Sequence, residues 1–225
     1  MRSGIIRAVV VALVAFLAAA PARAGLITNG GFEQPGGQTA DLFLPAGSTS
    51  LTGWTIVSGS VDVVPSTGSW PAYEGNQSLD LDGHSAGTIE QTFSTTAGVT
   101  YRLTFAYGNN PGGGAAKAGD PIVLPRTATV SVVGTSTLLS QDISHGTSTK
   151  SNMDWTVFVG TFTADSATTT LRFTSTDEPT SYGGIALDAV DVRAVPEPSG
   201  LALLGAGAAS LAGCVVWRRK SAAAG

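Results

Sequence analysis

The sequence predicts an all-β domain, a two-sheet antiparallel jelly-roll sandwich, and three observations support this fold class. The central part of the 225-residue chain contains no long segment with helical periodicity, and many of its short runs are apolar or alternate apolar and polar side chains. Gly, Pro, Asn and Asp separate these runs, as turn residues separate strands. About ten runs follow one another with no helix between them, which favours two packed antiparallel sheets.

The clearest strand is expected at residues 101–107, where aromatic and aliphatic side chains recur at every second position. Residues 155–162 are apolar on both faces, so we expect a central strand there. Residues 36–47 and 109–125 are rich in Gly and Pro and are expected to be loops. The other expected strands are 26–27, 54–57, 61–64, 78–81, 88–93, 127–133, 169–175 and 185–192.

The first 24 residues have the pattern of a secretory signal peptide. Two arginines precede an apolar run at 8–20, and the small residues Ala22 and Ala24 mark a cleavage site after Ala24. The apolar run is short for a membrane span, although an uncleaved anchor is an alternative.

The other end of the chain predicts a transmembrane helix at 201–217. Seventeen helical residues reach about 26 Å, slightly less than the ~30 Å hydrocarbon core, so the segment can span a thinned bilayer. Arg218, Arg219 and Lys220 follow the run. Basic residues favour the cytoplasmic side, so the domain before them is expected to face outward. A buried C-terminal helix is the alternative.

Residues 25–194 remain as the working domain. Its six Lys/Arg and fifteen Asp/Glu give a net charge of −9, so nucleic acid is not an expected partner. The chain's one cysteine, Cys214, lies in the apolar run at 201–217. Disulfides, thiol nucleophiles and cysteine metal sites are therefore excluded from this domain.

The C-terminal 31 residues, 195–225, resemble a PEP-CTERM sorting signal. Val195, Pro196, Glu197 and Pro198 precede the apolar run, and the basic cluster closes it. The resemblance implies export by a Gram-negative bacterium that makes exopolysaccharide. It also implies transient contact with the membrane protease exosortase and with the inner membrane.

The working domain resembles the choice-of-anchor C group and related galactose-binding-like β-sandwiches. The residues that carry this resemblance are 26–33, 53–54, 74–83, 87–93, 98–105 and 184–192. The resemblance implies the jelly roll, and it implies carbohydrate or cell-wall association by analogy only.

No catalytic residue is predicted. Residues 83–87 match the G-x-S-x-G pattern around Ser85, but a β-like run follows where a nucleophile elbow needs a helix. His145 and Asp142, only three residues apart, are poor partners for a triad. We therefore expect a turn at 83–87, and we expect His84 and His145 to be surface histidines.

A calcium site is a further prediction, because Ca²⁺ takes carboxylate oxygens from loops. Glu33 follows the first expected strand and Asp188 lies on the last. The resemblance implies a structural Ca²⁺ between these ends, and solvated or turn-capping acids are the alternative. Asp80 and Asp82 alternate with leucines and are expected on the wet face of a strand.

Loop aromatics are the candidate sugar ligands, because sugar C–H faces pack on rings. The candidates are Trp70, Tyr73, Tyr107 and Tyr182. The alternative for each is that its ring caps the core. Trp54 and Trp155 are expected in the core.

Together these features predict an exported, non-enzymatic cell-surface or matrix protein that is associated with exopolysaccharide and binds carbohydrate. Its expected location is the periplasm, the outer surface or the extracellular matrix. The alternatives are a structural biofilm-matrix protein without a sugar site, and a secreted hydrolase.

Overall fold

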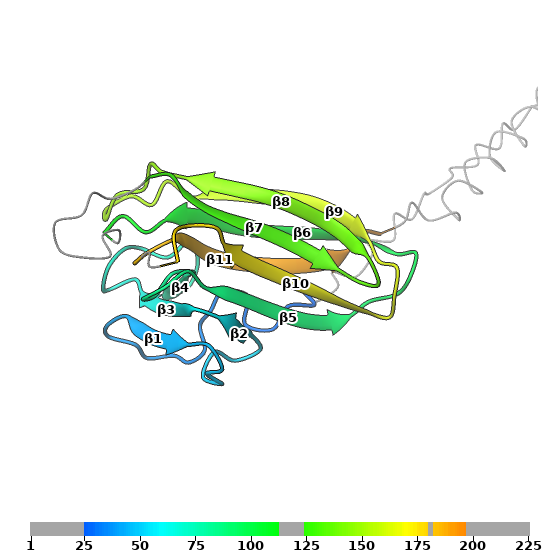
Figure 1. Cartoon of the computed structure of the whole chain (residues 1–225), viewed down its shortest axis with the longest axis horizontal. Helices are drawn as coiled ribbons and strands as arrows, with labels where there is room; N and C mark the ends of the chain where they lie inside the picture. Colours follow the sequence, from blue (N-terminus) through cyan, green and yellow to red (C-terminus); the bar gives the residue numbers. More distant parts are fainter. Residues whose placement is uncertain (1–24, 113–123, 180–181, 197–225) are drawn as a thin grey trace, which may run out of the picture.

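Two antiparallel sheets form the domain, as Figure 1 shows in a computed structural model that describes residues 25–112, 124–179 and 182–196. The six-stranded sheet has the order β1-β3-β4-β11-β6-β9, and the five-stranded sheet has the order β2-β5-β10-β7-β8. The strands are β1 Leu42–Pro45, β2 Thr55–Ser58, β3 Ser60–Pro65, β4 Gln77–Asp80, β5 Thr88–Ser94, β6 Thr100–Asn109, β7 Arg126–Val133, β8 Thr137–His145, β9 Thr156–Thr163, β10 Thr168–Ser175 and β11 Ile185–Ala194. The predicted two-sheet antiparallel sandwich is confirmed.

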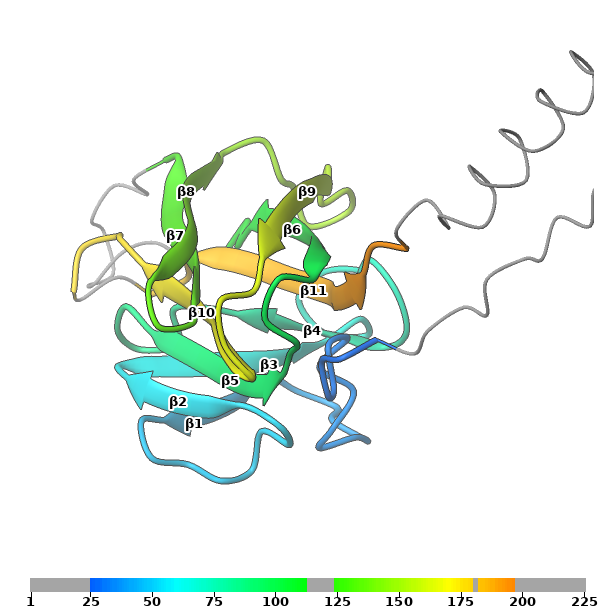
Figure 2. The same cartoon turned by 90° about the vertical axis from the view of Figure 1, so that its right-hand side faces the viewer.

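The long strands run along the long axis of the domain, with β8 and β9 on one side and β1 and β2 on the other (Figure 1). The view in Figure 2 shows how the sheets face each other. Strands that are adjacent in the sequence often lie in different sheets, as β4 and β5 do. The loops between them therefore cross from one sheet to the other at the ends of the sandwich.

The main core lies between the two sheets and follows the period of two in the strands. Leu103 and Phe105 of β6 point inward from the six-stranded sheet, and Leu171 and Phe173 of β10 point inward from the other. The rings of Phe105 and Phe173 meet edge to face across the interface, with centroids 5.0 Å apart. Burial of each such side chain contributes roughly 1.5–3 kcal/mol.

A smaller cluster covers the outer face of the six-stranded sheet. Val64 and Ala186 alternate with main-core residues along β3 and β11, so they point away from the main core. Trp70 and Met153, from the segments before β4 and before β9, pack on them. Partly buried Trp155 lies against this cluster, whereas Trp54 belongs to the main core as expected.

Two strands were not expected from the sequence. β1 falls inside the stretch 36–47, where a loop is predicted, and β8 is missing from the expected strands. β1 has only four residues, and its outer side chains are exposed. Short strands of this kind carry little periodic signal.

The expected strand at 26–27 is not a strand, but the segment does lie beside the last strand. The Leu26 N–H donates to the Val192 carbonyl at 2.9 Å, and the Val190 N–H donates to the Gly30 carbonyl at 2.9 Å. The start of the domain is therefore tied to β11 by backbone hydrogen bonds outside any regular ladder.

The prediction that residues 155–162 form a central strand is wrong. β9 is the edge of the six-stranded sheet, and the side chains of Val157 and Val159 are 48% and 55% exposed. Its outward valines face solvent, and only its inward residues pack on the core.

Several predictions concern residues outside the described part of the chain. These are the signal peptide with Ala22 and Ala24, the transmembrane segment 201–217, and sorting residues Glu197, Pro198, Arg218, Arg219 and Lys220. Val195 is described, and its N–H donates to the Thr100 carbonyl at 2.9 Å. In the described ranges, no helix is long and apolar enough to cross a bilayer.

Candidate functional site

Three neighbouring rings form an exposed row that we call the ring platform: Phe43, His84 and Tyr182. The Phe43 ring stacks on the His84 ring at 4.2 Å between centroids and 24° between planes. The Tyr182 ring follows His84 at 5.3 Å and 44°. All three side chains are exposed, Phe43 at 40% and Tyr182 at 39%. The platform is therefore an aromatic surface in contact with water.

The platform is built from one strand and two loops. Phe43 lies on β1 with its ring on the outer face, since its neighbour Leu44 packs into the main core. Its cross-strand partner is Asp62 of β3, which in turn faces Asp80 of β4. His84 lies in the loop between β4 and β5, and Tyr182 lies in the loop between β10 and β11.

Hydrogen bonds fix both loops beneath the rings. The His84 N–H donates to the Ser60 hydroxyl oxygen at 2.8 Å. The Gly183 N–H donates to the Asp82 carbonyl at 2.8 Å, and the Gly184 N–H donates to Asp80 Oδ1 at 2.8 Å. The strand β4 and the residues after it therefore position the loop that carries Tyr182.

Gly184 is required for this close approach. A Cβ at this position would lie 2.6 Å from Asp82 Cγ and 2.8 Å from each of its carboxylate oxygens. Only glycine lets the backbone pass so close to a buried carboxylate.

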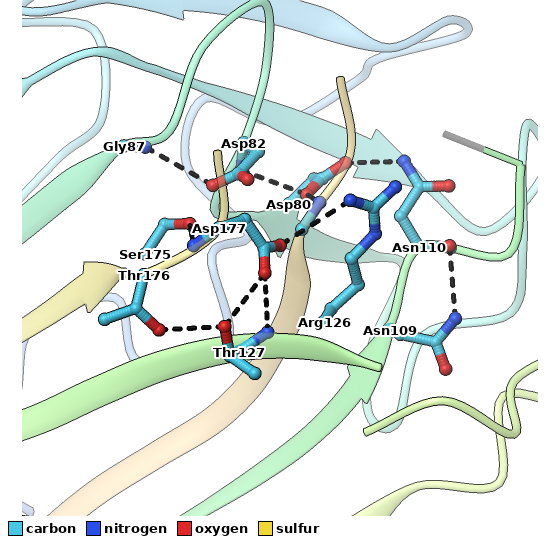
Figure 3. A network of polar contacts seen from close by, with 11 residues as sticks. Asp80, Asp82, Gly87, Asn109, Asn110, Arg126, Thr127, Ser175, Thr176 and Asp177 are labelled. Atoms are coloured by element: carbon cyan, nitrogen blue, oxygen red, sulfur yellow. Dashed lines mark hydrogen bonds and ion pairs between the residues drawn. The ribbon is translucent and has the colours of Figure 1, made fainter. Parts of the chain in front are cut away.

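Asp80 and Asp82 lie in a buried polar network, shown in Figure 3. Asp80 Oδ2 accepts from the Asn110 side-chain amide at 2.6 Å, and Asp80 Oδ1 accepts from the Asp82 N–H at 3.1 Å. Asp82 Oδ1 accepts from the Gly87 N–H at 3.3 Å. The prediction that these two acids occupy a wet strand face is wrong, because loops of both sheets cover them.

A second group in the same network centres on Asp177 (Figure 3). Asp177 Oδ1 accepts from the Thr127 N–H and hydroxyl, both at 2.9 Å. Its Oδ2 lies 3.7 Å from Nη1 of the buried Arg126. These contacts tie the segment after β10 to the first residues of β7.

Burial sets the protonation behaviour of these acids. It raises the pKa of Asp80 to about 8, with a further upward contribution from the Asp82 charge. It raises the pKa of Asp82 to about 6. Burial and the nearby Asp41 charge raise the pKa of Asp62 to about 6, and His84 partly offsets this effect. Asp80 and Asp82 are buried and inaccessible to a substrate, so their role is to hold loops in place.

The two predicted calcium residues, Glu33 and Asp188, contact the same segment of chain before β4. Glu33 Oε1 accepts from the backbone N–H groups of Asn76 and Gln77 at 2.7 and 2.9 Å. Asp188 Oδ2 accepts from the N–H groups of Tyr73 and Glu74 at 2.8 and 3.1 Å. The two carboxylates therefore anchor the loop at 73–77.

The region around these carboxylates is acidic. A Cβ on Gly31 would lie 3.4 Å from Glu74 Oε1 and 3.7 Å from Asp188 Oδ1. Burial raises the pKa of Asp188 to about 7, although its backbone hydrogen bonds lower it. Within the described ranges, however, no group of three or more His, Cys, Asp or Glu is arranged to hold a metal ion.

The four predicted sugar-binding aromatics do not lie together. Trp70 is 3% exposed and its indole N–H donates to the Ser78 hydroxyl at 3.0 Å, so its ring is a core ring in this structure. Tyr107 is half-buried on β6, and its ring is nearly perpendicular to the ring of His145, at 83°. Tyr73 is exposed and meets Trp155 edge to face at 6.2 Å. Only Tyr182 belongs to the ring platform.

The sequence patterns did not predict that the rings of Phe43 and His84 lie beside the ring of Tyr182. Phe43 lies in a stretch predicted to be a loop, and His84 was expected to be an isolated surface residue. The expected exposure of His84 agrees with the structure. The alternation of residues 42–45 could have predicted the position of Phe43, because it places the Phe43 side chain on the face of the strand opposite to the Leu44 side chain.

Ser85 lies in the turn expected at 83–87, and β5 follows it. The Ser85 hydroxyl is 3.2 Å from the Ser60 hydroxyl. The prediction of a surface position for His145 is wrong, because it is buried, with its ring nitrogens 2.9 Å from Asn109 Oδ1 and 2.9 Å from the Asp154 carbonyl.

Comparison with known families covers almost the whole described domain. The family model described as "Protein of unknown function (DUF642)" matches residues 25–193. The chain belongs to the DUF642 family. A second model, the PEP-CTERM protein-sorting motif, matches residues 194–220 and confirms the resemblance seen in the tail.

One curated relative of this DUF642 chain is halomucin of Haloquadratum walsbyi. The two are 35% identical over 205 residues, which is 85% of this chain. The chain spans only 2% of the length of halomucin.

Solved structures that resemble this DUF642 domain include TmCBM61 in complex with β-1,4-galactotriose (TM-score 0.47, 15% identity, 77% of this chain and 100% of that chain). An arabinose-bound α-L-arabinofuranosidase, MgGH51, is similar at a TM-score of 0.46 and 14% identity over 76% of this chain and 26% of that chain. The CBM22-1 xylan-binding domain of Paenibacillus barcinonensis Xyn10C has a TM-score of 0.43 and 17% identity, over 69% of this chain and 94% of that chain.

Proposed function

We propose that this chain is an exported, non-catalytic surface or matrix protein that binds extracellular polysaccharide through the ring platform. The single observation that carries the binding proposal is the exposed row Phe43–His84–Tyr182. Exposed rings of this kind cost free energy in water and offer flat faces to the C–H groups of a sugar. The hydroxyls of Tyr182 and of Ser85, the residue that follows His84, supply polar partners.

The loops beneath the platform support a binding role, because a binding site gains from preorganisation. The hydrogen bonds from His84, Gly183 and Gly184 hold the rings before any ligand arrives. A ligand that packs on the rings then orders few additional groups.

The test is a polysaccharide array probed with the full chain in detergent. We expect at least one polysaccharide to bind, and Phe43→Ala and Tyr182→Ala each to weaken that binding about tenfold, the loss of roughly 1.4 kcal/mol. Val57→Ala is the matched control, since Val57 is also exposed but lies on β2 of the other sheet. A blank array would favour a structural matrix protein without a sugar site, and equal binding by all variants would mean that the sugar site is not the ring platform.

Export is proposed to proceed through a signal peptide at 1–24 that is cleaved after Ala24. The sorting motif at 194–220 supports recognition of the tail by exosortase at the inner membrane. The domain 25–194 would then reach the periplasm, the outer surface or the exopolysaccharide matrix. Deletion of residues 195–220 should redirect the protein on cell fractionation, whereas deletion of 221–225 should not, and unchanged localisation would contradict this proposal.

A structural calcium ion at Glu33 and Asp188 stays a prediction. Both carboxylates already accept backbone N–H groups, which gives them a role without a metal. Thermal melts with Ca²⁺ and with EDTA distinguish the two roles: a calcium-dependent rise in Tm that is lost in Glu33→Gln supports the ion, and superimposable melts favour loop anchoring.

The non-catalytic part of the proposal rests on the surroundings of the candidate groups. Ser85 is followed by a strand instead of a helix, and the nearest hydroxyl partner is Ser60. Asp80 and Asp82, whose pKa values are raised, are buried beneath the loops. Hydrolysis of any arrayed polysaccharide that disappears in Ser85→Ala would favour the hydrolase alternative.

A further inference from the structure

The ring platform has an acidic border. Asp62 is the cross-strand partner of Phe43, so its side chain lies on the same outer face, one strand away. Asp41 precedes Phe43 by two residues and is exposed. The charges of Asp41 and His84 both act on Asp62. Two carboxylates therefore flank the rings on which a sugar would pack.

Asp62 lacks a donor at one of its oxygens. Its Oδ1 is buried and has no hydrogen-bond partner among the residues that the structure describes. A buried acceptor without a partner costs about 1–3 kcal/mol, and more for a charged group. The raised pKa of Asp62 reflects the same cost, since burial and Asp41 both disfavour its ionised form.

Three arginines of the domain form ion pairs with acids other than Asp41 and Asp62. Arg172 pairs with Glu90, Arg193 pairs with Asp191, and Arg126 is buried beside Asp177. The domain as a whole has a net charge of −9. Such a field attracts a cationic polymer and repels an acidic one.

We propose that the ring platform, together with Asp41 and Asp62, binds a polysaccharide with free amino groups, a cationic amino-sugar polymer. The sugar rings pack on Phe43 and Tyr182, and an ammonium group lies at the exposed Asp41 carboxylate, where the charge of Asp62 also attracts it. The buried Oδ1 of Asp62 is not itself a contact. Among the described residues, no Lys or Arg forms an ion pair with Asp41 or Asp62, and an ammonium would supply that positive charge. The inference rests on the proposed function and narrows its substrate class.

Other polysaccharide classes fit less well. A uronic-acid polymer would bring more negative charge to a negative face. A neutral polymer could pack on the rings but would leave the charge of the two carboxylates uncompensated. An N-acetylated amino sugar has the same ring as the free amine and lacks its charge, so it is the sharpest comparison.

The experiment titrates the full chain in detergent with two hexamers, one of glucosamine and one of N-acetylglucosamine, at about pH 7. At this pH a free amine of the α-amino class is mostly protonated, and Asp62, with a pKa of about 6, is mostly ionised. Isothermal calorimetry should show about tenfold or greater preference for the glucosamine hexamer. The preference should shrink when salt is raised from about 0.05 to 0.5 M, because screening weakens exposed charge pairs.

Variants distinguish the contribution of the carboxylate charge to binding from the contribution of the rings. Asp41→Asn and Asp62→Asn should each reduce the preference for the amine. Asp41→Asn should leave the fold intact, because the Asp41 side chain is exposed and an amide oxygen can still accept from the Ser69 hydroxyl. Phe43→Ala should weaken the binding of both hexamers by the same factor. Glu178→Ala, an exposed acid in the loop after β10, is the control and should change neither.

The outcomes distinguish the two proposals. Equal affinity for the hexamers that is lost in Phe43→Ala overturns the amino-sugar inference and leaves polysaccharide binding standing. An amine preference that survives both Asp variants also overturns it. Failure of every polysaccharide to bind overturns both proposals.

Discussion

Gly184 illustrates how one residue can determine whether a surface site forms. Its missing side chain leaves room for the Asp82 carboxylate, and its N–H donates to Asp80. Gly184→Ala should therefore destabilise the fold by about 1–3 kcal/mol, the usual cost of forcing atoms into a packed site. It should also weaken sugar binding, because Tyr182 lies two residues away. Urea denaturation and the array measure the two effects.

The matched control for this prediction is Gly112→Ala. There a Cβ would first meet Lys150 Cε at 3.2 Å, the far end of a flexible side chain that can move. We expect a change within about 0.5 kcal/mol. Equal destabilisation by the two variants would argue against a specific role for the contact between Gly184 and Asp82.

Single acids were the least predictable residues. Asp80 and Asp82 alternate with leucines, which in an isolated strand means one wet and one dry face. In the domain, loops from both sheets close over that wet face, and Asn110 and Gly184 arrive from distant positions in the chain. No local pattern contains that information. The ring contacts of His84 with Phe43 and Tyr182 could not be predicted from the sequence for the same reason.

At the scale of elements, β9 shows why a hydrophobic run is ambiguous. Its residues are apolar on both faces, a pattern typical of a buried strand. In the structure it is an edge strand whose inner face packs on the core while its outer valines are exposed. The strands β6, β7 and β10, by contrast, were predicted well, because the alternation of their apolar and polar residues indicates which face is buried.

The two faces of β9 should respond differently to substitution. Phe162 is 3% exposed and stacks on Tyr101 at 5.5 Å, so Phe162→Ala should cost about 3–5 kcal/mol. Val159→Lys on the outer face should change the unfolding free energy by no more than about 0.5 kcal/mol. Chemical denaturation of both variants checks this. A large loss in Val159→Lys would mean that another surface covers the outer face.

The described domain has the predicted fold class because that prediction depends on features repeated along the chain. Strand-length runs and turn residues recur many times along the domain, and the lack of cysteine holds throughout it. Two short or weakly patterned strands, β1 and β8, were not predicted from the sequence, but neither changes the fold class. The site depends on single contacts between loops, and sequence patterns do not encode those.

The pH dependence of stability is a property of the whole molecule, since it sums over acids in several elements. Burial raises the pKa of Asp62, Asp80, Asp82 and Asp188 to about 6, 8, 6 and 7. Each group binds its proton more tightly in the folded chain than in the unfolded chain, where its pKa is about 3.9. The folded state therefore binds more protons, and the unfolding free energy falls as pH rises.

The fall should begin near pH 4 and end above about pH 8, when Asp80 is ionised. Asp165 acts in the opposite sense, because hydrogen bonds from Thr135 and Ser136 lower its pKa, and its effect lies below this window. We expect the urea midpoint of the full chain to be highest near pH 4, lower at pH 5 and clearly lower still at pH 8. Asp80→Asn should flatten the upper part of the profile, because its neutral amide has no proton to lose, whereas Glu178→Ala should leave the profile unchanged. A midpoint that rises between pH 5 and pH 8 would show that these carboxylates are stabilised as anions, which would require a bound cation or donor groups beyond the contacts at Asn110, Gly184 and the loop at 73–77.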